Sequence, residues 1–520
     1  MDTNRTLLDK IDRLNAIGVA LSEGEDELVL LERILLGAKE LTGSDGGTLY
    51  LLNEQHQLEF RLLFTDSLGL AMGGRNRAAV TLAPLDLYSP AGEARNHLIA
   101  VRAALSGEVI RVDDAYASSD FDFSGARQFD QRLGYHTQAV LAVPMRNHEK
   151  EVIGVIQLIN PLIEKTAVVR TFTHEDLHFC RSLASQAAVA LTQNRLIAGL
   201  EELFDALIRM IATTIDEKSK FTGSHCRQVP QITLLIADAL ENCTQGSYAD
   251  WQMKNAERRE LELAAWLHDC GKLSTPVHLI DKQTKLEGIR DNIELVATRM
   301  AVLRAEGQAA ANLQPLPDLQ ADFDFLHQCN SGGEFLQPAE QQRIAQLAKT
   351  YHWPDLSGRR QPLLTAAEIA DLQISRGTLN DQERAQINSH VVMTRKILTT
   401  LPFPKHLRNV PEIAARHHEK LNGKGYPHGL SAAELGVPER ILAIADIFES
   451  LVACDRPYRP AKKLSEVLQI MAKMVEFNDI DGEIYACFIT SGAMEAYVRE
   501  NLSAAQLDVD FPQLVAAQQA

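Results

Sequence analysis

The sequence predicts a multidomain protein in which an α+β sandwich is followed by a long connecting helix and an all-α domain. With 520 residues, the chain is long for a single hydrophobic core. Strand-like apolar runs occur between about residues 47 and 160, whereas helical periodicity continues from Glu175 onward. Because the two patterns occupy separate stretches, we expect at least two domains.

The first domain begins with apolar residues at helical spacing in 7–21 and 28–41, and the second of these helices ends at Thr42-Gly43. A further helix is expected at 99–106. Asn147 to Lys150 has the composition of a hairpin turn between the last two strands. The five strand-like runs lie at 47–52, 58–64, 109–112, 139–145 and 152–160. This order of elements predicts an α+β sandwich.

A heptad pattern then connects the two candidate domains. Its apolar residues are spaced by four, three, four and three, at Leu196, Leu200, Leu203, Leu207 and Met210. One face of a core helix would give the same pattern. However, the helical stretch is longer than the usual helix of about 11–12 residues, so we favour a coiled coil that forms a homodimer. A rotation at one end of such a helix would be transmitted to the other.

After the charged stretch Asp216–Lys220 the chain is almost wholly helical. Pro230 fits the first turn of a helix that starts near Val229. The candidate helices are 229–240, 258–267, 382–398, 410–418, 440–454 and 464–474.

Composition excludes several classes of function. The formal net charge of −17 is unfavourable to DNA binding, so any anionic ligand needs locally gathered cations. No run of eighteen apolar residues indicates a membrane span, and the N-terminus lacks a signal-peptide core, so we expect a cytoplasmic protein. Dispersed cysteines argue against a disulfide framework and a thiolate zinc site. The seven are Cys180, Cys226, Cys243, Cys270, Cys329, Cys454 and Cys487.

Histidine and aspartate side chains recur where amphipathic helices turn inward. Asp446, within the apolar run Ile441–Phe448, is the clearest case, because a buried carboxylate needs a partner. A single buried histidine can be structural, but a bound metal would satisfy the whole set, which is His225, His268, Asp269, His390, His417, His418 and Asp446. Nitrogen and oxygen ligands without thiolates favour iron or manganese.

The order of elements in the first domain, with the motifs Ala142–Met145 and Ile153–Asn160, resembles a GAF domain. The resemblance covers about 26–193 and implies that 1–193 is a GAF sensor domain with an N-terminal helix. Cyclic-nucleotide GAF domains carry Asn-Lys and Phe-x-x-x-Asp-Glu; here Asn160 precedes Pro161, and Asp176 precedes Leu177. A cyclic-nucleotide ligand is therefore in doubt, and a dimerising module or a sensor of another ligand remains open.

The helical part is similar to the HD-GYP family of metal-dependent phosphohydrolases over about 208–492. The motifs that carry the likeness are Thr222-Gly223-Ser224-His225, His268-Asp269-Cys270-Gly271-Lys272, His390, His417-His418-Glu419-Lys420, Gly425-Tyr426-Pro427, Ala445–Glu449 and Arg456-Pro457-Tyr458-Arg459. The resemblance implies a connecting helix at 194–220, an HD-GYP domain at 221–492 and a C-terminal tail at 493–520.

The family's known activity is hydrolysis of cyclic di-GMP to linear pGpG and, in some members, to GMP. The resemblance implies that the seven His and Asp residues bind two metals, which Asp269 bridges. It assigns catalytic roles to His268, Asp269 and Lys272. It implies substrate contacts for Lys272, Arg456, Arg459 and Tyr426, which supply the required cations. A substrate such as 3′,3′-cyclic GMP-AMP, or a non-catalytic module that senses the dinucleotide or docks partner signalling proteins, are the alternatives.

Two departures from the family pattern bear on these expectations. Some members place a third-metal Glu before the first His, where this chain has Phe221, so we expect a binuclear centre. About ninety residues, 289–377, are inserted before the pattern resumes at Thr378. This polar, partly helical insert could be a lid, a partner-binding arm or a neutral surface elaboration. Its Gly332–Phe335 run resembles the signature loop of cyclic di-GMP synthases, and we attribute that likeness to chance.

Overall fold

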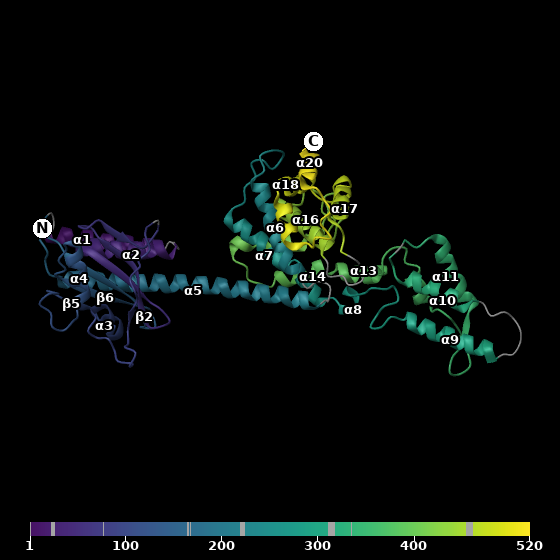
Figure 1. Cartoon of the computed structure of the whole chain (residues 1–520), viewed down its shortest axis with the longest axis horizontal. Coiled ribbons are helices and arrows are strands. Elements are labelled where there is room, and N and C mark those ends of the chain that lie inside the picture. Colours follow the sequence, from purple (N-terminus) through teal and green to yellow (C-terminus); the bar gives the residue numbers. More distant parts are fainter. Residues whose placement is uncertain are drawn as a thin grey trace. The chain divides into compact units, whose positions relative to one another are not determined.

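The protein was analysed as a computed structural model that describes residues 2–21, 26–75, 77–163, 166, 168–218, 224–309, 318–333, 335–453 and 461–519. The chain divides into two compact units, Met1–Leu203 and Phe204–Ala520. The division falls inside one continuous helix, α5 (His174–Lys218), so each unit contains part of it (Figure 1).

The N-terminal unit is built on an antiparallel sheet of seven described strands in the order β3-β2-β1-β7-β6-β5, with β4 paired to β2. All five predicted strands are present, and the hairpin turn at Asn147–Lys150 joins β6 to β7. The two short strands β3 and β4 were not predicted. The strands are β1 (Ser44–Leu52), β2 (Gln57–Thr65), β3 (Leu70–Met72), β4 (Leu85–Asp86), β5 (Ile110–Val112), β6 (Val140–Arg146) and β7 (Val152–Pro161).

Helices cover both faces of this sheet. Leu141 and Val143 of β6 enter a core with α2 (Glu27–Thr42) and the start of α5, next to α1 (Asp2–Leu21). The alternate residue Val140 enters a second core with α3 (Ile99–Ser106), which α4 (Ser124–Leu133) borders. The alternation follows from the two-residue period of a strand. The predicted α+β sandwich is confirmed.

Helix α5 changes its surroundings along its length. Leu183 and Leu191 are buried in the core of the N-terminal unit, and Ala212 and Ile215 in that of the helical unit. Between them, the five heptad residues Leu196, Leu200, Leu203, Leu207 and Met210 are 44–65% exposed. The heptad face is therefore not part of either core.

Outside the insert, the helices of the helical unit pack around one large core. The turn after α7 forms a short 3₁₀ helix, η1 (Cys270–Ser274), followed by α8 (Val277–Ile280). The helices that matter for the site are α6 (His225–Glu241), α7 (Asn255–Leu267), α13 (Asp381–Asn388), α14 (His390–Leu398), α15 (Val410–Ala415), α16 (Val437–Val452), α17 (Leu464–Glu476) and α18 (Gly482–Thr490). Among the described helices, none is both long and apolar enough to cross a membrane.

Three sequence-based expectations need correction. Helix α6 starts at His225 rather than near Val229, so Pro230 lies inside it and has no N–H to donate to the Cys226 carbonyl four residues earlier. The predicted helix 382–398 is two helices that meet at Ser389. The expected tail 493–520 instead forms α19 (Ala493–Asn501) and α20 (Phe511–Gln519). These helices join the main core because Met494, Tyr497, Val498 and Phe511 are buried in it.

The insert has a hydrophobic core of its own, which its polar composition did not indicate. Val296, Leu326, Ile344 and Leu363 are among its buried residues. The Lys282 ammonium lies 2.7 Å from a Glu383 carboxylate oxygen, and Thr378 donates a 3.3 Å hydrogen bond to the Lys282 carbonyl, so both ends of the insert meet. The elements are α9 (Ile293–Ala309), α10 (Leu319–Asn330), α11 (Pro338–Thr350), β8 (His352–Pro354), β9 (Arg360–Pro362) and α12 (Ala366–Leu372).

Candidate metal centre

His268 and Asp269 lie in the turn between α7 and η1, and α14 fixes this turn from the side. Thr394 accepts a 2.9 Å hydrogen bond from the Gly271 N–H and donates a 2.9 Å bond to the His268 carbonyl. A side chain at Gly271 would lie 1.9 Å from the His390 carbonyl oxygen. Glycine is therefore required at this position, because it allows the two ligand-bearing segments to touch.

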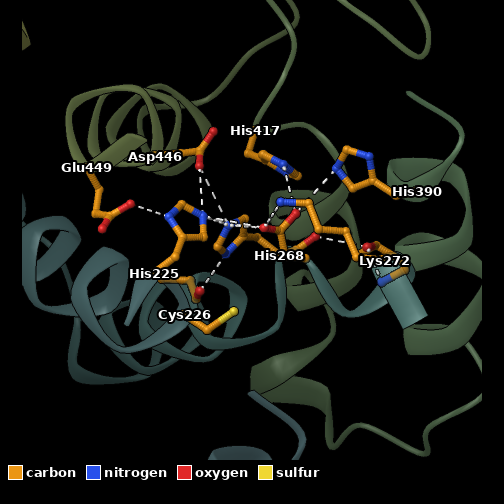
Figure 2. Close-up of polar contacts among 12 residues, drawn as sticks. His225, Cys226, His268, Lys272, His390, His417, Asp446 and Glu449 are labelled. Carbon is orange, nitrogen blue, oxygen red and sulfur yellow. Dashed lines mark hydrogen bonds and ion pairs between the residues drawn. The ribbon is translucent and has the colours of Figure 1, made fainter. Parts of the chain in front are cut away.

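The remaining polar residues enter the same site from four other segments. His225 and His390 are the first residues of α6 and α14. His417 and His418 follow α15, and Asp446 is in the middle of α16. In Figure 2, His225 and Asp446 lie on one side of the cluster and His390 and His417 on the other. The structure thus brings all seven sequence-predicted ligands together.

Asp269 occupies the centre of this cluster. Its Oδ2 lies 3.4 Å from His225 Nε2 and 3.3 Å from His268 Nε2. Its Oδ1 lies 3.3 Å from His390 Nε2 and 4.0 Å from His417 Nε2. Three-residue sets with ligand atoms within 4.8 Å of one another form on each side: His225, His268 and Asp446; and His390, His417 and His418.

Contacts at Nδ1 orient four imidazoles. In His268, His390 and His417 the Nδ1 donates to the carbonyl three residues earlier, at 2.8, 2.7 and 2.7 Å. In His225 the Nδ1 contacts the Glu449 carboxylate. Each Nε2 is therefore the nitrogen left to face the cluster, which is the arrangement that orients metal-ligating histidines.

Three buried atoms at the centre of the cluster have no hydrogen-bond partner among the described residues: Asp269 Oδ1, His390 Nε2 and His417 Nε2. Their Nδ1 donors make both imidazole Nε2 atoms electron-pair donors, like the carboxylate oxygen. Electron-pair donors that face one another without a proton are unfavourable when buried. A divalent cation would satisfy all three, so the donor set fits a metal centre.

Electrostatics keep two carboxylates and two imidazoles of the cluster in the forms that bind cations. Burial would raise the pKa of Asp269, but Lys272, His268 and His225 outweigh it and hold that pKa well below its usual value. At Asp446, burial would again raise the pKa, but His225 and His418 outweigh burial and lower it. Burial lowers the pKa of His417, and lowers that of His418 to about 4. Carboxylates are thus ionised and these two imidazoles neutral at pH 7. At His225, burial would lower the pKa, but the carboxylates of Asp269, Asp446 and Glu449 outweigh it and raise that pKa well above its usual value, so cation binding there must displace a proton.

Two of the predicted substrate residues border the cluster. The Lys272 ammonium lies 2.5 Å from Asp269 Oδ2, and the Tyr426 ring centroid lies 4.9 Å from that of His418. Arg456 and Arg459 lie outside the described residues, as does Phe221, on which the expected metal count depends.

The loop that carries Tyr426 is held by backbone contacts. Buried Glu419 accepts hydrogen bonds from the N–H groups of His428 and Leu430, at 2.7 and 2.9 Å. A side chain at Gly425 would lie 2.4 Å from the Lys420 nitrogen, so the loop folds back closely on its own start. This packing brings Tyr426 against His418.

Sequence reasoning missed three residues that support the cluster: Glu449, Thr394 and Lys218. Glu449 lies three residues after Asp446 and Thr394 four after His390, so helical spacing places each on the face of its ligand. That spacing was a usable signal. No comparable pattern marked Lys218.

The end of α5 reaches the same site within the helical unit. The Lys218 ammonium donates to the carbonyls of Lys272, Leu273 and Thr275, at 2.8, 2.6 and 2.7 Å. Two residues earlier, Asp216 accepts a 3.1 Å hydrogen bond from the Cys226 N–H. The connecting helix therefore contacts η1, beside the His-Asp pair, and the first turn of α6, beside His225.

The fold and the buried donor set define a helical metal-binding domain preceded by an α+β domain. A GAF domain model matches residues 26–191 and an HD domain model matches 364–484. The chain therefore contains a GAF domain and an HD domain, as the sequence motifs indicated. The HD match includes His390, His417, His418 and Asp446, whereas His225 and the His268-Asp269 pair precede it, because the insert separates them.

Curated relatives match about a fifth of the chain. The chain is 39% identical over 109 residues to 3′3′-cGAMP-specific phosphodiesterase 1 of Vibrio cholerae, which is 21% of this chain and 24% of that protein. It is 38% identical over 111 residues, 21% of this chain and 23% of the relative, to 3′3′-cGAMP-specific phosphodiesterase 3 of the same organism. It is also 33% identical over 110 residues to a cyclic di-GMP phosphodiesterase of Thermotoga maritima. That match covers 21% of this chain and 28% of the relative. The chain thus spans about a quarter of the length of these relatives.

Proposed function

We propose that this protein is a metal-dependent phosphodiesterase that hydrolyses cyclic di-GMP to linear pGpG, under control of its GAF domain. The observation that carries this proposal is the trio of buried, unpartnered donors Asp269 Oδ1, His390 Nε2 and His417 Nε2. A purely structural cluster would pair these atoms. The likeness to cyclic-dinucleotide phosphodiesterases supports the same reaction class.

The seven His and Asp residues would hold two iron or manganese ions, with one oxygen of Asp269 directed to each side. Bound divalent ions would polarise the phosphodiester and lower the pKa of the attacking water toward about 7. The chain's own part is to fix the geometry: the carbonyls of Ala265, Ile387 and Ala414 orient three imidazoles, and Glu449 orients the fourth.

Lys272 would bind a substrate phosphate. Its ammonium now pairs with Asp269, and its side chain is 24% exposed, so it lies at the boundary between the cluster and solvent. Once a cation occupies Asp269, the ammonium is free to bind phosphate oxygen as a point charge. Arg456 and Arg459 would hold the rest of the dinucleotide, and Tyr426 would form part of its binding surface.

The direct test is turnover by the full-length chain, loaded with Mn(II) or with Fe(II) under reducing conditions. The expected product of cyclic di-GMP is linear pGpG, which chromatography detects. The Lys272→Met variant should have a higher KM than the wild type and the same metal content. Dinucleotide binding without hydrolysis, at full metal occupancy, would instead favour the non-catalytic sensing module.

A second substrate, 3′,3′-cyclic GMP-AMP, is favoured by one observation. Two relatives with 39% and 38% identity carry that specificity in their names, against 33% for the cyclic di-GMP enzyme. Both dinucleotides should therefore be assayed at equal concentration, and the higher kcat/KM identifies the substrate.

GAF control would pass along α5 to Lys218 and Asp216, which contact the segments beside the ligands. Deleting residues 1–193 should change the rate of hydrolysis. Lys218→Met should remove most of the difference between the full-length and truncated chains, whereas Lys218→Arg, which keeps the charge, should preserve part of it. A rate that does not respond to the deletion would contradict this route.

The exposed heptad face supports a parallel homodimer through α5. Replacing Leu200 and Leu203, which are 65% and 56% exposed, by Lys should give monomers in light scattering without loss of helix content. A wild-type chain that is already monomeric at micromolar concentration would contradict the dimer.

A further inference from the structure

Two cysteines that are far apart in sequence lie against each other in the helical unit. Cys243 follows α6, Cys487 is on α18, and their sulfur atoms are 2.7 Å apart across a separation of 244 residues. Cys487 is buried (9% exposed), whereas Cys243 is partly exposed. The described cysteines Cys180, Cys226, Cys270 and Cys329 are all buried. The pair thus combines one accessible thiol with one protected thiol.

A set of polar contacts holds the two sulfur atoms together. The backbone N–H and hydroxyl of Ser247 donate to the Glu483 carboxylate, at 2.7 and 2.8 Å. Tyr248 donates to Asp481 at 2.7 Å, and Arg440 of α16 donates to the same carboxylate at 2.8 Å. These contacts tie the segment after α6 to the start of α18, so the approach of the thiols does not depend on the cysteines themselves.

We propose that Cys243 and Cys487 are a reversible redox pair that forms an intramolecular disulfide by exchange with a low-molecular-weight disulfide such as oxidised glutathione. This site is independent of the metal cluster and of the proposed hydrolysis. Disulfides in reducing compartments are usually redox-sensing rather than structural, which fits a single pair in a chain whose other described thiols are buried.

The exchange takes two steps. The Cys243 thiolate attacks one sulfur of oxidised glutathione, whose S–S bond breaks and releases one glutathione thiolate. The Cys487 sulfur then attacks Cys243 Sγ; the mixed disulfide breaks, and the second glutathione leaves with the proton from Cys487. Two protein thiols are oxidised and one glutathione disulfide is reduced to two thiols.

The environment assigns these roles. Cys243 is the accessible sulfur and makes a 3.3 Å contact to the Gln245 carbonyl oxygen. Burial, followed by the Cys243 contact, raises the pKa of Cys487 to about 12, so Cys487 remains a thiol until Cys243 is activated. Cys243 is therefore the attacking residue and Cys487 the resolving residue.

The bond would join the segment that follows α6 to α18. Because it closes a loop of 244 residues, it would restrict the unfolded chain and raise the unfolding midpoint of the helical unit. We expect a rise of about 5 °C or more on oxidation, reversed by a thiol reductant.

The test is a redox titration of the full-length protein in buffers of reduced and oxidised glutathione. Intact mass should fall by two hydrogen atoms, and peptide mapping should place the bond between Cys243 and Cys487. Cys243→Ser, at the partly exposed position, should abolish both the mass change and the shift in melting temperature. Cys487→Ala should leave a glutathione adduct on Cys243, and Cys329→Ala, a matched control in the insert core, should behave as wild type.

Two outcomes would overturn the proposal. The first is a glutathione adduct that persists on Cys243 in the wild-type chain. The second is a disulfide that maps to other cysteines. A Cys243–Cys487 bond that leaves the melting temperature unchanged would support the redox pair and contradict only its stabilising role.

Discussion

Asp130 of the GAF domain and Asp269 of the helical unit are equally buried, each 2% exposed, but their surroundings differ. The Asp130 carboxylate accepts hydrogen bonds from the Thr137 N–H, the Thr137 hydroxyl and the Tyr116 hydroxyl, at 2.8, 3.0 and 3.0 Å. Asp269 instead faces histidine nitrogens, and its Oδ1 has no hydrogen-bond donor among the described residues. Burial alone therefore does not mark a functional carboxylate; the unfilled hydrogen-bonding capacity does.

The largest effect is expected from Asp269→Asn. An amide cannot bridge two cations, so metal content should fall and hydrolysis should drop by more than about 100-fold, beyond the loss typical of supporting residues. Metal analysis and the chromatographic assay measure both. The matched variant Asp130→Asn should retain full metal content and activity; if both variants lose activity alike, the contrast between the two carboxylates fails.

Glu449→Gln should have the next largest effect. The neutral amide keeps the shape of the side chain but weakens its contact with His225 Nδ1, so metal affinity should fall about 10–100-fold. Competition with a chelator gives the affinity. Unchanged affinity would mean that Glu449 is only a packing residue of α16.

Metal loading should stabilise the two domains unequally. A free metal concentration of about 100 times Kd stabilises the folded state that binds the metal by about 2.7 kcal/mol. Calorimetry with and without Mn(II) should therefore shift the transition of the helical unit and leave that of the GAF domain in place. The Asp269→Asn chain is the control, and it should show no shift.

The smallest effect is expected at Asp130. In Asp130→Asn, the amide group cannot accept all three hydrogen bonds that the carboxylate accepts. The free energy of unfolding of the GAF domain should therefore fall by about 1–3 kcal/mol. Denaturant titration of the GAF transition measures this change. A loss near zero would show that the carboxylate is not needed to hold Thr137 and Tyr116.

Local patterns predicted most of the fold, and the exceptions have physical reasons. Period-two and helical spacing located the five predicted strands and the ligand-bearing helices. Strands β3 and β4 have only three and two residues, too few to show a period-two pattern. Pro230 was placed in the first turn of its helix, but α6 begins five residues before it, at His225. The hydrophobic core of the insert was hidden because its buried residues are dispersed among polar ones.

The sequence predicted the candidate metal ligands better than the residues that hold those ligands in place. Asp446 stands in an apolar run, and the other ligands lie in short ordered motifs, both of which a sequence displays directly. Thr394, Lys218 and the Cys243–Cys487 pair act through residues 54–244 positions away, and only the folded chain reveals such contacts.

The ion pair between Lys282 and Glu383 has a consequence for how the chain accommodates its insert. It joins two positions 101 residues apart, and the chain between them folds around a separate core. The entropic cost of closing a loop rises only with the logarithm of its length. Lengthening a loop whose ends are already held together therefore adds little to that cost. For the histidines before and after the insert, these 101 residues therefore act as a short connection whose two ends lie together. We therefore expect changes in the length of the insert to leave the arrangement of the His and Asp cluster unchanged.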